Sequence, residues 1–488
     1  MTTGLLSLQR PGIGRALVTV GCLVAVADLL FYEHPLGISL AVFLLALGIG
    51  STVAAPRSGP PGQWVMAAVC LILATGPVVI QPGPLPIAFG IVGAAYLAVT
   101  LSTESAGHVD RLFAAVPLFA QTGWRIAPDP YRIFKDFRKA GWIALDAGTF
   151  LAWVVPVGLG GVFLGLFAAA NPLIDNRLME LGPVFAHVAV RQARVFGWAA
   201  TAALVWPFIV VQPKTWRPSM GAANTPTSCN WMSLFGAPTI RRSLILFNAL
   251  FLIQTCMDVF YLWGEAALPD GLTYADYAHR GAYPLIVTAL LAGWFAIVAT
   301  KPGAQAAGSA FTRQLMLLWI GQNLLLVVSS LQRLHLYVQA YSLTTLRLWA
   351  FVWMVLVGVG LISITARIVL GRSDAWLLRI NLCSLVLALY VSCFVDAPKT
   401  IATYNVHHCR EISGQGAALD LQYLRELGPQ AIPALDILHR LDEKAYQHSD
   451  APLVRAALAA EFSARPSDWR RWDFWSWRLA GYLRRPSP

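Results

Sequence analysis

The sequence has few charged residues and lacks the motifs of common enzyme classes. Only 12% of its 488 residues are Asp, Glu, Lys or Arg, whereas an average soluble domain has about 25%. It contains no GxxxxGK[ST] phosphate-binding loop, no HExxH, no GxSxG and no histidine-kinase core. We therefore expect neither ATP hydrolysis nor metalloprotease chemistry, and we predict no cofactor.

Cysteine pairs are also missing. The seven cysteines include no CxxC pair, which argues against a disulfide framework. We predict that they are small core residues, and five of them fall inside apolar runs: Cys22, Cys70, Cys256, Cys383 and Cys393. The run His407-His408-Cys409 has metal-ligand chemistry, but adjacent side chains diverge on a helix or strand. We predict no metal site there.

Long apolar runs are abundant instead. Hydrophobic residues make up 57% of the chain and the mean hydropathy is +0.59. A helix of roughly 20 apolar residues crosses a bilayer, and the runs do not alternate as the strands of a barrel would. The predicted fold class is all-α, a polytopic transmembrane helix bundle. About eleven spans are expected, at residues 16–32, 36–54, 64–80, 85–102, 149–170, 195–211, 243–264, 282–300, 313–331, 348–370 and 376–395.

The distribution of Lys and Arg predicts the orientation. The formal net charge is +11, and the cations concentrate in alternate loops, as the positive-inside rule requires. This places the N-terminus, as a retained signal anchor, in the cytoplasm and the C-terminus in the periplasm, with no role for nucleic acid. The predicted regions are four N-terminal spans (1–104), a cytoplasmic basic loop (105–148), a seven-span core (149–395) and a small helical tail (396–488).

The basic loop carries one group of cations at helical spacing: Arg132, Lys135, Arg138 and Lys139. Such a face attracts anionic lipid, so these residues are candidate lipid contacts. The alternative is ordinary positive-inside charge.

The tail is predicted to contain three helices. Asp420 caps the first, which ends at Gly428-Pro429, an apolar run over 432–441 forms the second, and Asp450 starts a third before Pro466. Residues 467–485 then combine four tryptophans and Tyr482 with five arginines. That composition suits the bilayer interface; the alternative is packing on the rest of the tail.

Two polar clusters stand in or beside apolar spans, and a charge near the centre of such a helix costs at least about 2.5 to 3.5 kcal/mol. The first begins in the span 243–264 and supplies acids. The second follows the span 313–331 and supplies cations; a continuing helix would place Arg333, Tyr337 and Tyr341 on one stripe. Both are expected to face a shared outer vestibule. The candidate ligand-binding residues are Asp258, Tyr261, Asp276, Tyr277, His279, Arg280, Arg333, Tyr337, Tyr341 and Arg347.

Three interpretations of these clusters remain open. The first is a network of salt bridges and tyrosine hydrogen bonds that fastens two outer loops, because partly buried ions persist when paired. The second is a site for an anionic or zwitterionic ligand, with Arg333 and Arg347 as anion clamps. The third is catalysis with His279 as a general base oriented by Asp276, although no nucleophile motif accompanies them and we name no catalytic residue.

Smaller polar signals lie within or beside the spans. Asp28 is near the end of the first span, and we interpret it as a side chain that reaches water. The amides of Asn248, Gln322 and Asn323 are predicted to bridge helices, as amides do in bundles.

The same clusters carry a resemblance to a known family. The sequence contains DVFYLWG, then LPDGLTYADYAHRGAYPLI, later SLQRLHLYVQAYSLTTLRLWAF, and YNVHHCREISGQGAALDLQYLRELGPQAIPAL in the tail. Over roughly residues 150–440 it resembles bacterial membrane proteins of domain of unknown function 4173, grouped with the related 4153 type. The resemblance implies a bacterial inner membrane, a tail that belongs with the membrane core, and no defined activity. Its shared positions correspond to Asp258, Tyr274, Tyr277, Arg280, Gly281, Arg333, Tyr337, Tyr341, Thr344, Arg347, Asn171, Pro172, Asn405 and Asp420.

The function expected from these observations is an inner-membrane protein that binds or moves a small or lipidic ligand. One alternative is a membrane enzyme acting on an envelope lipid or polymer. The other is a scaffold or sensor whose tail meets partners. Membrane lipids are the expected surroundings in each case.

Overall fold

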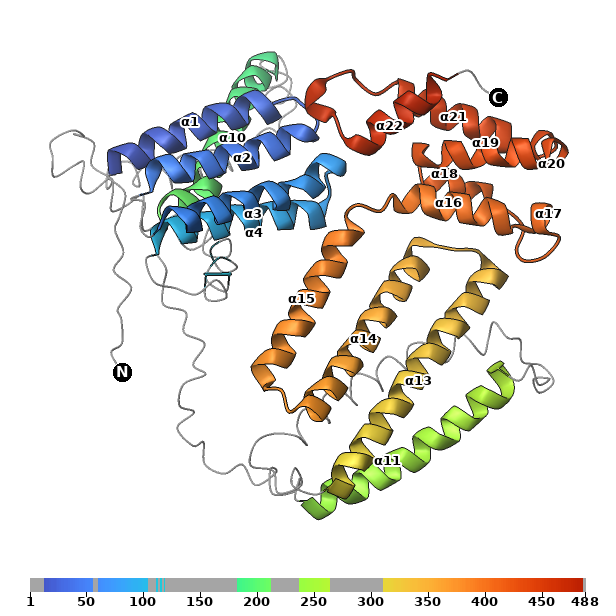
Figure 1. The fold of residues 1–488 in the computed structure, drawn as a ribbon. Helices are drawn as coiled ribbons and strands as arrows, with labels where there is room; N and C mark the ends of the chain where they lie inside the picture. The colour runs from blue at the N-terminus through green and yellow to red at the C-terminus, as the bar shows by residue number, and fades with distance from the viewer. Residues whose placement is uncertain are drawn as a thin grey trace, which may run out of the picture. The chain divides into compact units, whose positions relative to one another are not determined.

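The fold was analysed in a computed structural model that describes residues 13–55, 60–103, 111–112, 115, 118, 182–211, 237–263 and 310–485. Every regular element in these ranges is a helix, which confirms the all-α prediction. The chain divides into two compact units, Met1–Arg217 with Ser467–Arg478, and Pro218–Pro466 with Leu479–Pro488 (Figure 1). The predicted division into four regions stays a prediction.

The first unit is a bundle of apolar helices. Its helices are α1 (Ile13–Phe31), α2 (Ile38–Ala54), α3 (Pro61–Ile80), α4 (Pro84–Ser102) and α10 (Gly182–Ile209). Both α3 and α4 have proline in the first turn, where its missing N–H costs nothing. Glycine lets α3 and α4 approach closely: a Cβ on Gly93 would lie 2.7 Å from the Ala74 Cβ. Small residues at such contacts are typical of membrane helices.

The second unit contains the helices that carry the candidate site. They are α11 (Ala237–Asp258), η2 (Val259–Trp263), α13 (Ala310–Tyr341), α14 (Thr345–Leu370) and α15 (Asp374–Ser392). Among the long helices, α11 packs on α13, α13 on α14, and α14 on α15, so the four lie side by side in chain order (Figure 1).

Amide side chains connect two of these helices, as predicted. Asn248 Nδ2 on α11 donates to the Leu315 carbonyl on α13 at 3.0 Å, and Gln322 Nε2 on α13 donates to the Asn248 carbonyl at 3.3 Å. The Asn323 amide instead donates to Trp319 O of its own helix at 2.8 Å. Two of the three amides therefore bridge α11 and α13.

The tail in the second unit is a cluster of short helices, as predicted. These are α16 (Ala397–His408), α17 (Arg410–Ser413), α18 (Leu421–Glu426), η4 (Pro429–Ala431), α19 (Ile432–Leu441), α20 (Glu443–Gln447) and α21 (Ala451–Ser463). Asp420 caps α18 by accepting the Tyr423 N–H at 2.9 Å, and α19 covers the expected apolar run. After α21 come η5 (Trp469–Arg471) and α22 (Phe474–Leu483), which begins in the first unit and ends in the second.

The described helices show that the chain is a multi-pass membrane protein. Seven of them are long and apolar enough to cross a bilayer, and two shorter apolar helices, Ile38–Ala54 and Arg194–Ile209, match two further expected spans. The expected spans 149–170 and 282–300 lie outside the described residues. The count of eleven and the orientation therefore stay predictions.

One prediction about individual side chains is wrong, and another leaves out a contact. Cys393 and Cys409 are buried, but Cys22, Cys256 and Cys383 are exposed on their helices, because an apolar helix in a membrane also has an apolar outer face. The side chain of Asp28 is partly exposed (17%), and protein groups also hold it. It accepts two bonds from the Arg194 guanidinium, at 2.9 and 2.5 Å, and one from Trp198 Nε1 at 2.8 Å.

Candidate functional site

A buried ion pair joins two spans of the second unit. Arg333 on α13 donates to the carboxylate of Asp258, the last residue of α11. Asp258 is 1% exposed and Arg333 is 3% exposed. The sequence analysis expected acids from one cluster to meet cations from the other. The structure brings these two predicted residues together.

The acid of this pair has a second polar neighbour and an unusual backbone. Gln254, one turn earlier on α11, donates from Nε2 to Asp258 Oδ1 at 2.9 Å. Directly after Asp258 the helix continues as the π-helical segment η2, in which each N–H bonds to the carbonyl five residues back. Such segments are rare and occur frequently at functional sites. Asp258 therefore sits where the hydrogen-bonding register of the helix changes.

The predicted polar stripe on α13 is formed. The helix continues to Tyr341, ten residues past the expected end of the span at Leu331, so Arg333, Tyr337 and Tyr341 follow one another at successive turns. The rings of Tyr337 and Tyr341 lie 5.0 Å apart between centroids, and the Arg347 guanidinium carbon lies 4.3 Å from the Tyr337 centroid. Four candidate residues thus belong to one local group that starts at the buried pair.

Arg347 stabilises the end of α13. Its Nη1 donates to the Tyr341 carbonyl at 2.6 Å and also to the Ser342 carbonyl. A cation at a helix C-terminus satisfies carbonyls that lack intrahelical partners and interacts favourably with the helix dipole. These contacts favour the network interpretation for Arg347 over a role as a free anion clamp.

The turn between α13 and α14 is tight. Ser342 has a φ of 67°, a left-handed conformation that costs a non-glycine residue roughly 1 to 2 kcal/mol. Thr344 caps α14, because its Oγ1 accepts the Arg347 N–H at 3.4 Å. A backbone of this kind persists only where its surroundings hold it.

The tail supplies those surroundings. Asn405 on α16 accepts the Leu343 N–H at 2.7 Å and donates to the Leu343 carbonyl at 3.0 Å. Tyr423 on α18 accepts the Thr345 N–H at 3.0 Å. We call this set of contacts, from Asn405 and Tyr423 to Leu343 and Thr345, the turn attachment. It confirms, in this structure, that the tail belongs with the membrane helices that carry Arg333 and Arg347.

Apolar packing and a close backbone approach complete the turn attachment. Val338, Leu343 and Ile401 form a buried cluster between the turn and the tail. A Cβ on Gly416 would lie 3.1 Å from the Gln339 carbonyl on α13 and 3.0 Å from the His408 carbonyl. Charge patterns in the sequence give no signal for this contact, since the groups are neutral; only the family resemblance singled out Asn405.

Several predicted residues lie outside the described part of the chain. Asp276, Tyr277, His279 and Arg280 lie outside the described residues, and so do Arg132, Lys135, Arg138 and Lys139. The backbone of Tyr261 belongs to η2, and its side chain lies outside the described part of the structure. Their assignment to a ligand or lipid site stays a prediction. Within the described parts of the chain, no group of three or more His, Cys, Asp or Glu side chains is arranged to hold a metal ion.

The first unit contains two polar contacts that the sequence analysis did not anticipate. Arg194 pairs with Asp28, and its guanidinium carbon also lies 4.5 Å from the Tyr32 ring centroid. Arg111 lies within the range predicted as the basic loop, 105–148, but it is fully buried and donates to Gln63 Oε1 at 2.7 Å. Partners so far apart along the chain give no local sequence signal.

Comparison with other proteins gives a family match and no activity. No characterised protein and no solved structure was found to match the chain. A family match covers residues 19–438, and it is to the related 4153 type, so the 4173 type named in the resemblance is not shown. The matched stretch includes the buried pair, the polar stripe and the turn attachment. The chain therefore belongs to the family described as domain of unknown function DUF4153.

Proposed function

We propose that this protein binds or moves a small or lipidic ligand in the bacterial inner membrane, with Asp258 and Arg333 as the charged centre of the site. The observation that carries the proposal is the buried pair itself, which joins two apolar helices and has almost no exposed surface. Ionisable groups in membrane spans are rare and mark ligand or proton pathways by default.

Stability alone is a poor reason for this pair. Removing two charges from water costs several kcal/mol per ion, and replacing a buried pair by apolar side chains is often neutral or stabilising. The helices already have apolar contacts, such as Ile240 and Leu244 of α11 with Met316, Trp319 and Ile320 of α13. A pair that is not needed for packing is available for exchange with a ligand.

The chemistry of such an exchange follows from the contacts. Arg333 is a bidentate donor suited to carboxylate or phosphate groups, and Asp258 occupies it at rest. An anionic group on the ligand competes with Asp258 for Arg333. This exchange changes the charge at the junction of α11 and η2, where the helix register changes.

The direct test is native mass spectrometry of the purified protein beside Arg333→Gln and Asp258→Asn. We expect a co-purifying mass in the native protein that is lost in Arg333→Gln. The matched control is Arg455→Gln, which removes a cation from the tail pair Asp436–Arg455 and should leave the mass bound. No bound mass in any sample would overturn the proposal.

A charge swap separates binding from folding. The double variant Asp258→Arg with Arg333→Asp restores an ion pair of opposite direction. Thermal unfolding in detergent should show more stability in the double variant than in either single substitution. The co-purifying mass should still be absent, because the guanidinium is no longer on α13. Recovery of both properties would mean that the pair is structural only.

A second candidate function is a sensor whose tail reports to the membrane helices, and the turn attachment favours it. Asn405 and Tyr423 hold the backbone that follows Arg333, Tyr337 and Tyr341. Deleting residues 396–488 should then abolish function in cells even when the ligand mass is still bound. Retained function in the deletion, with loss in Arg333→Gln, would exclude the sensor.

A further inference from the structure

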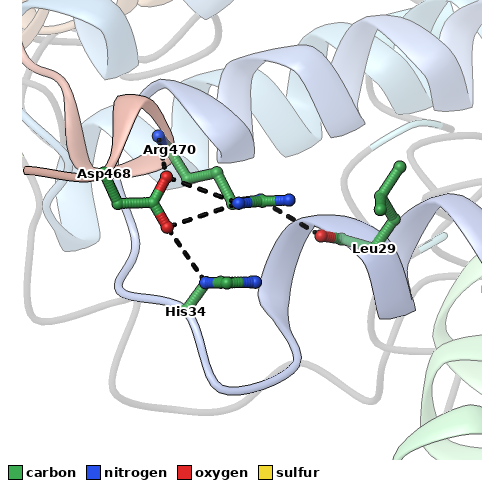
Figure 2. Close-up of polar contacts among 4 residues, drawn as sticks. All are labelled: Leu29, His34, Asp468 and Arg470. Carbon is green, nitrogen blue, oxygen red and sulfur yellow. Dashed lines mark hydrogen bonds and ion pairs between the residues drawn. The ribbon is translucent and has the colours of Figure 1, made fainter.

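The tryptophan-rich part of the tail is fastened to a loop of the first unit. Arg470 Nε donates to the Leu29 carbonyl of α1 at 3.1 Å, and the Trp472 carbonyl accepts the N–H of Ile38, the first residue of α2, at 2.8 Å. Figure 2 shows Arg470 reaching the end of α1. These bonds join residues more than 400 positions apart in the sequence, so the segment has a defined place beside the bundle.

Ionisable side chains reinforce this contact. His34 Nδ1 lies 2.9 Å from Asp468 Oδ2, and Arg470 Nη1 lies 3.3 Å from the same oxygen (Figure 2). The backbones also touch: a Cβ on Gly37 would lie 2.4 Å from the Arg470 carbonyl oxygen. We call these contacts, from Asp468, Arg470 and Trp472 to the end of α1 and the loop before α2, the loop attachment.

The loop attachment fixes the depth of the segment in the membrane. Helix α1 is a candidate span that ends at Phe31, and the apolar helix α2 begins at Ile38. The loop between an apolar helix that enters a bilayer and one that leaves it must lie at the membrane surface. Residues bonded to both sides of that loop therefore lie at headgroup level, whichever side of the membrane this is.

The side chains that this segment exposes suit the headgroup layer. Trp469 is 56% exposed and Trp477 is 58% exposed. The two acids are engaged within the protein, since Asp468 takes part in the loop attachment and Asp473 caps α22 by accepting the Ser476 N–H at 2.8 Å. Among the described residues, Arg471 and Arg478 have no carboxylate partner.

We propose that Ser467–Arg478 is a binding surface for the headgroups of anionic phospholipids. The indole rings of Trp469 and Trp477 occupy the interface, where amphipathic rings are enriched. The guanidinium groups of Arg471 and Arg478 contact lipid phosphates, because three arginines against two aspartates leave the segment with a net positive charge. The surface involves none of the residues of the Asp258–Arg333 site and stands or falls separately from it.

The nature of the partner is decided by the loop attachment. Exposed tryptophans with arginines also occur at protein interfaces. A protein partner, however, would have to compete with lipids that surround both α1 and α2 at this level. The bonds to Leu29 and Ile38 therefore support the lipid bilayer as the partner of this surface. A protein partner would appear in the experiment below as adducts to protein only.

Photo-crosslinking in nanodiscs tests the surface directly. The full-length protein carries p-benzoylphenylalanine in place of Trp477 and is reconstituted in phosphatidylcholine with one quarter phosphatidylglycerol. We expect a covalent lipid adduct after illumination. The matched control carries the same probe in place of Leu453, which is 70% exposed in the tail and makes none of the contacts of the loop attachment. An adduct yield at position 477 no higher than at 453, or adducts to protein only, would overturn the proposal.

The charge of the lipid forms the second arm. In the Trp477 probe protein, phosphatidylglycerol should be enriched in the adduct over its share of the bilayer. The double variant Arg471→Gln with Arg478→Gln should lower this enrichment by about fivefold or more, while total adduct yield and the thermal unfolding midpoint change little. Unchanged enrichment would show that the two arginines do not recognise anionic headgroups.

Discussion

The tail is attached to helix connections in two places, and the two attachments differ in chemistry. The turn attachment uses neutral groups: the amide of Asn405 and the phenol of Tyr423 bond to the backbone of Leu343 and Thr345. The loop attachment adds ionisable, partly exposed side chains, His34, Asp468 and Arg470, to its backbone bonds. The tail is thus held to one helix connection by neutral hydrogen bonds and to the other partly by ionisable side chains.

The difference predicts how each attachment responds to conditions. A buried hydrogen bond between neutral groups is not screened by salt, and losing one partner leaves the other unsatisfied. Exposed ion pairs contribute little and weaken at high ionic strength. We therefore expect the turn attachment to persist whenever the protein is folded, and the loop attachment to depend on pH and salt.

The largest expected effect on stability comes from a substitution in the turn attachment. Asn405→Ala removes both bonds to Leu343 and leaves a buried N–H and a buried carbonyl without partners, which should cost about 2 to 4 kcal/mol of local stability. The measurement is hydrogen exchange of peptides that contain Leu343. Gln422→Ala, which shortens an exposed amide of the same tail, is the control and should change exchange little. Equal exchange in both variants would show that Asn405 does not hold the turn.

Two glycines of the tail give the next effect. Gly416 has a φ of 86° and close backbone neighbours, whereas Gly414 has a φ of 72° and open space around its Cβ position. Gly414→Ala should cost only the backbone strain, about 1 to 2 kcal/mol. Gly416→Ala should cost about 1 kcal/mol more, because its methyl group meets the Gln339 and His408 carbonyls. Limited proteolysis of the tail measures both, and equal susceptibility would mean that the approach to α13 is unimportant.

A hydrogen bond inside the tail shows how much stability a single polar contact contributes. Tyr482 on α22 donates to Asp436 Oδ2 at 2.9 Å, and Tyr482→Phe should cost about 1 kcal/mol. Burial, with this bond, raises the pKa of the Tyr482 phenol above its usual 10.0. The stabilisation is therefore present below pH 10 and lost as the pH rises through the raised value. Thermal unfolding from pH 8 to 11 checks this, and a phenylalanine variant with the same alkaline loss would contradict it.

The loop attachment should show a smaller effect on stability, and this effect should depend on pH. The Arg470 backbone N–H, followed by the Arg470 charge and His34, lowers the pKa of Asp468 below its usual 3.8. Its contribution is thus present above about pH 4 and lost as the pH falls through the lowered value. In this acidic range, hydrogen exchange of the Ile38 amide, corrected for the intrinsic rate, should rise severalfold. The variant Asp468→Asn should show the same faster exchange at neutral pH. The Leu343 amide is the control; equal acid sensitivity of both amides would remove the distinction between the attachments.

The smallest effect concerns the strained residue of the turn. Ser342→Gly relieves the left-handed conformation but adds freedom to the unfolded chain, so the net change should be within about 0.5 kcal/mol. Combined with Asn405→Ala it should recover part of the lost protection at Leu343. No recovery would show that Asn405 resists separation of the tail rather than strain in the turn.

Local signals made much of the architecture predictable. The length of an apolar run specifies a span, and a capping residue followed by an apolar run specifies a short helix. Asp420 and the run 432–441 therefore led to the helices that the structure contains. That acids of the first cluster meet cations of the second was also predictable, because a charge beside a span needs a partner of opposite sign.

Choices between partners could not be read from the sequence. Arg347 and Arg333 have the same side chain, but one bonds to backbone carbonyls and the other to a carboxylate. Asn405 is neutral and leaves no charge pattern, and Asp28 finds Arg194 far along the chain. The segment 467–485 fitted either the bilayer or the tail. In the structure Trp472 bonds to Ile38, while Tyr482 packs with the tail cluster.

The length of α13 has a mechanical consequence. With 32 residues, it extends about 48 Å at 1.5 Å per residue, against a hydrocarbon thickness of about 30 Å. A continuous helix of this length must either tilt steeply in the bilayer or extend well beyond the lipid. A change in bilayer thickness changes the tilt of α13. Because the helix is continuous, it also moves the turn attachment at the C-terminal end of α13. Membrane thickness is therefore a physical input that this helix can convey to the tail.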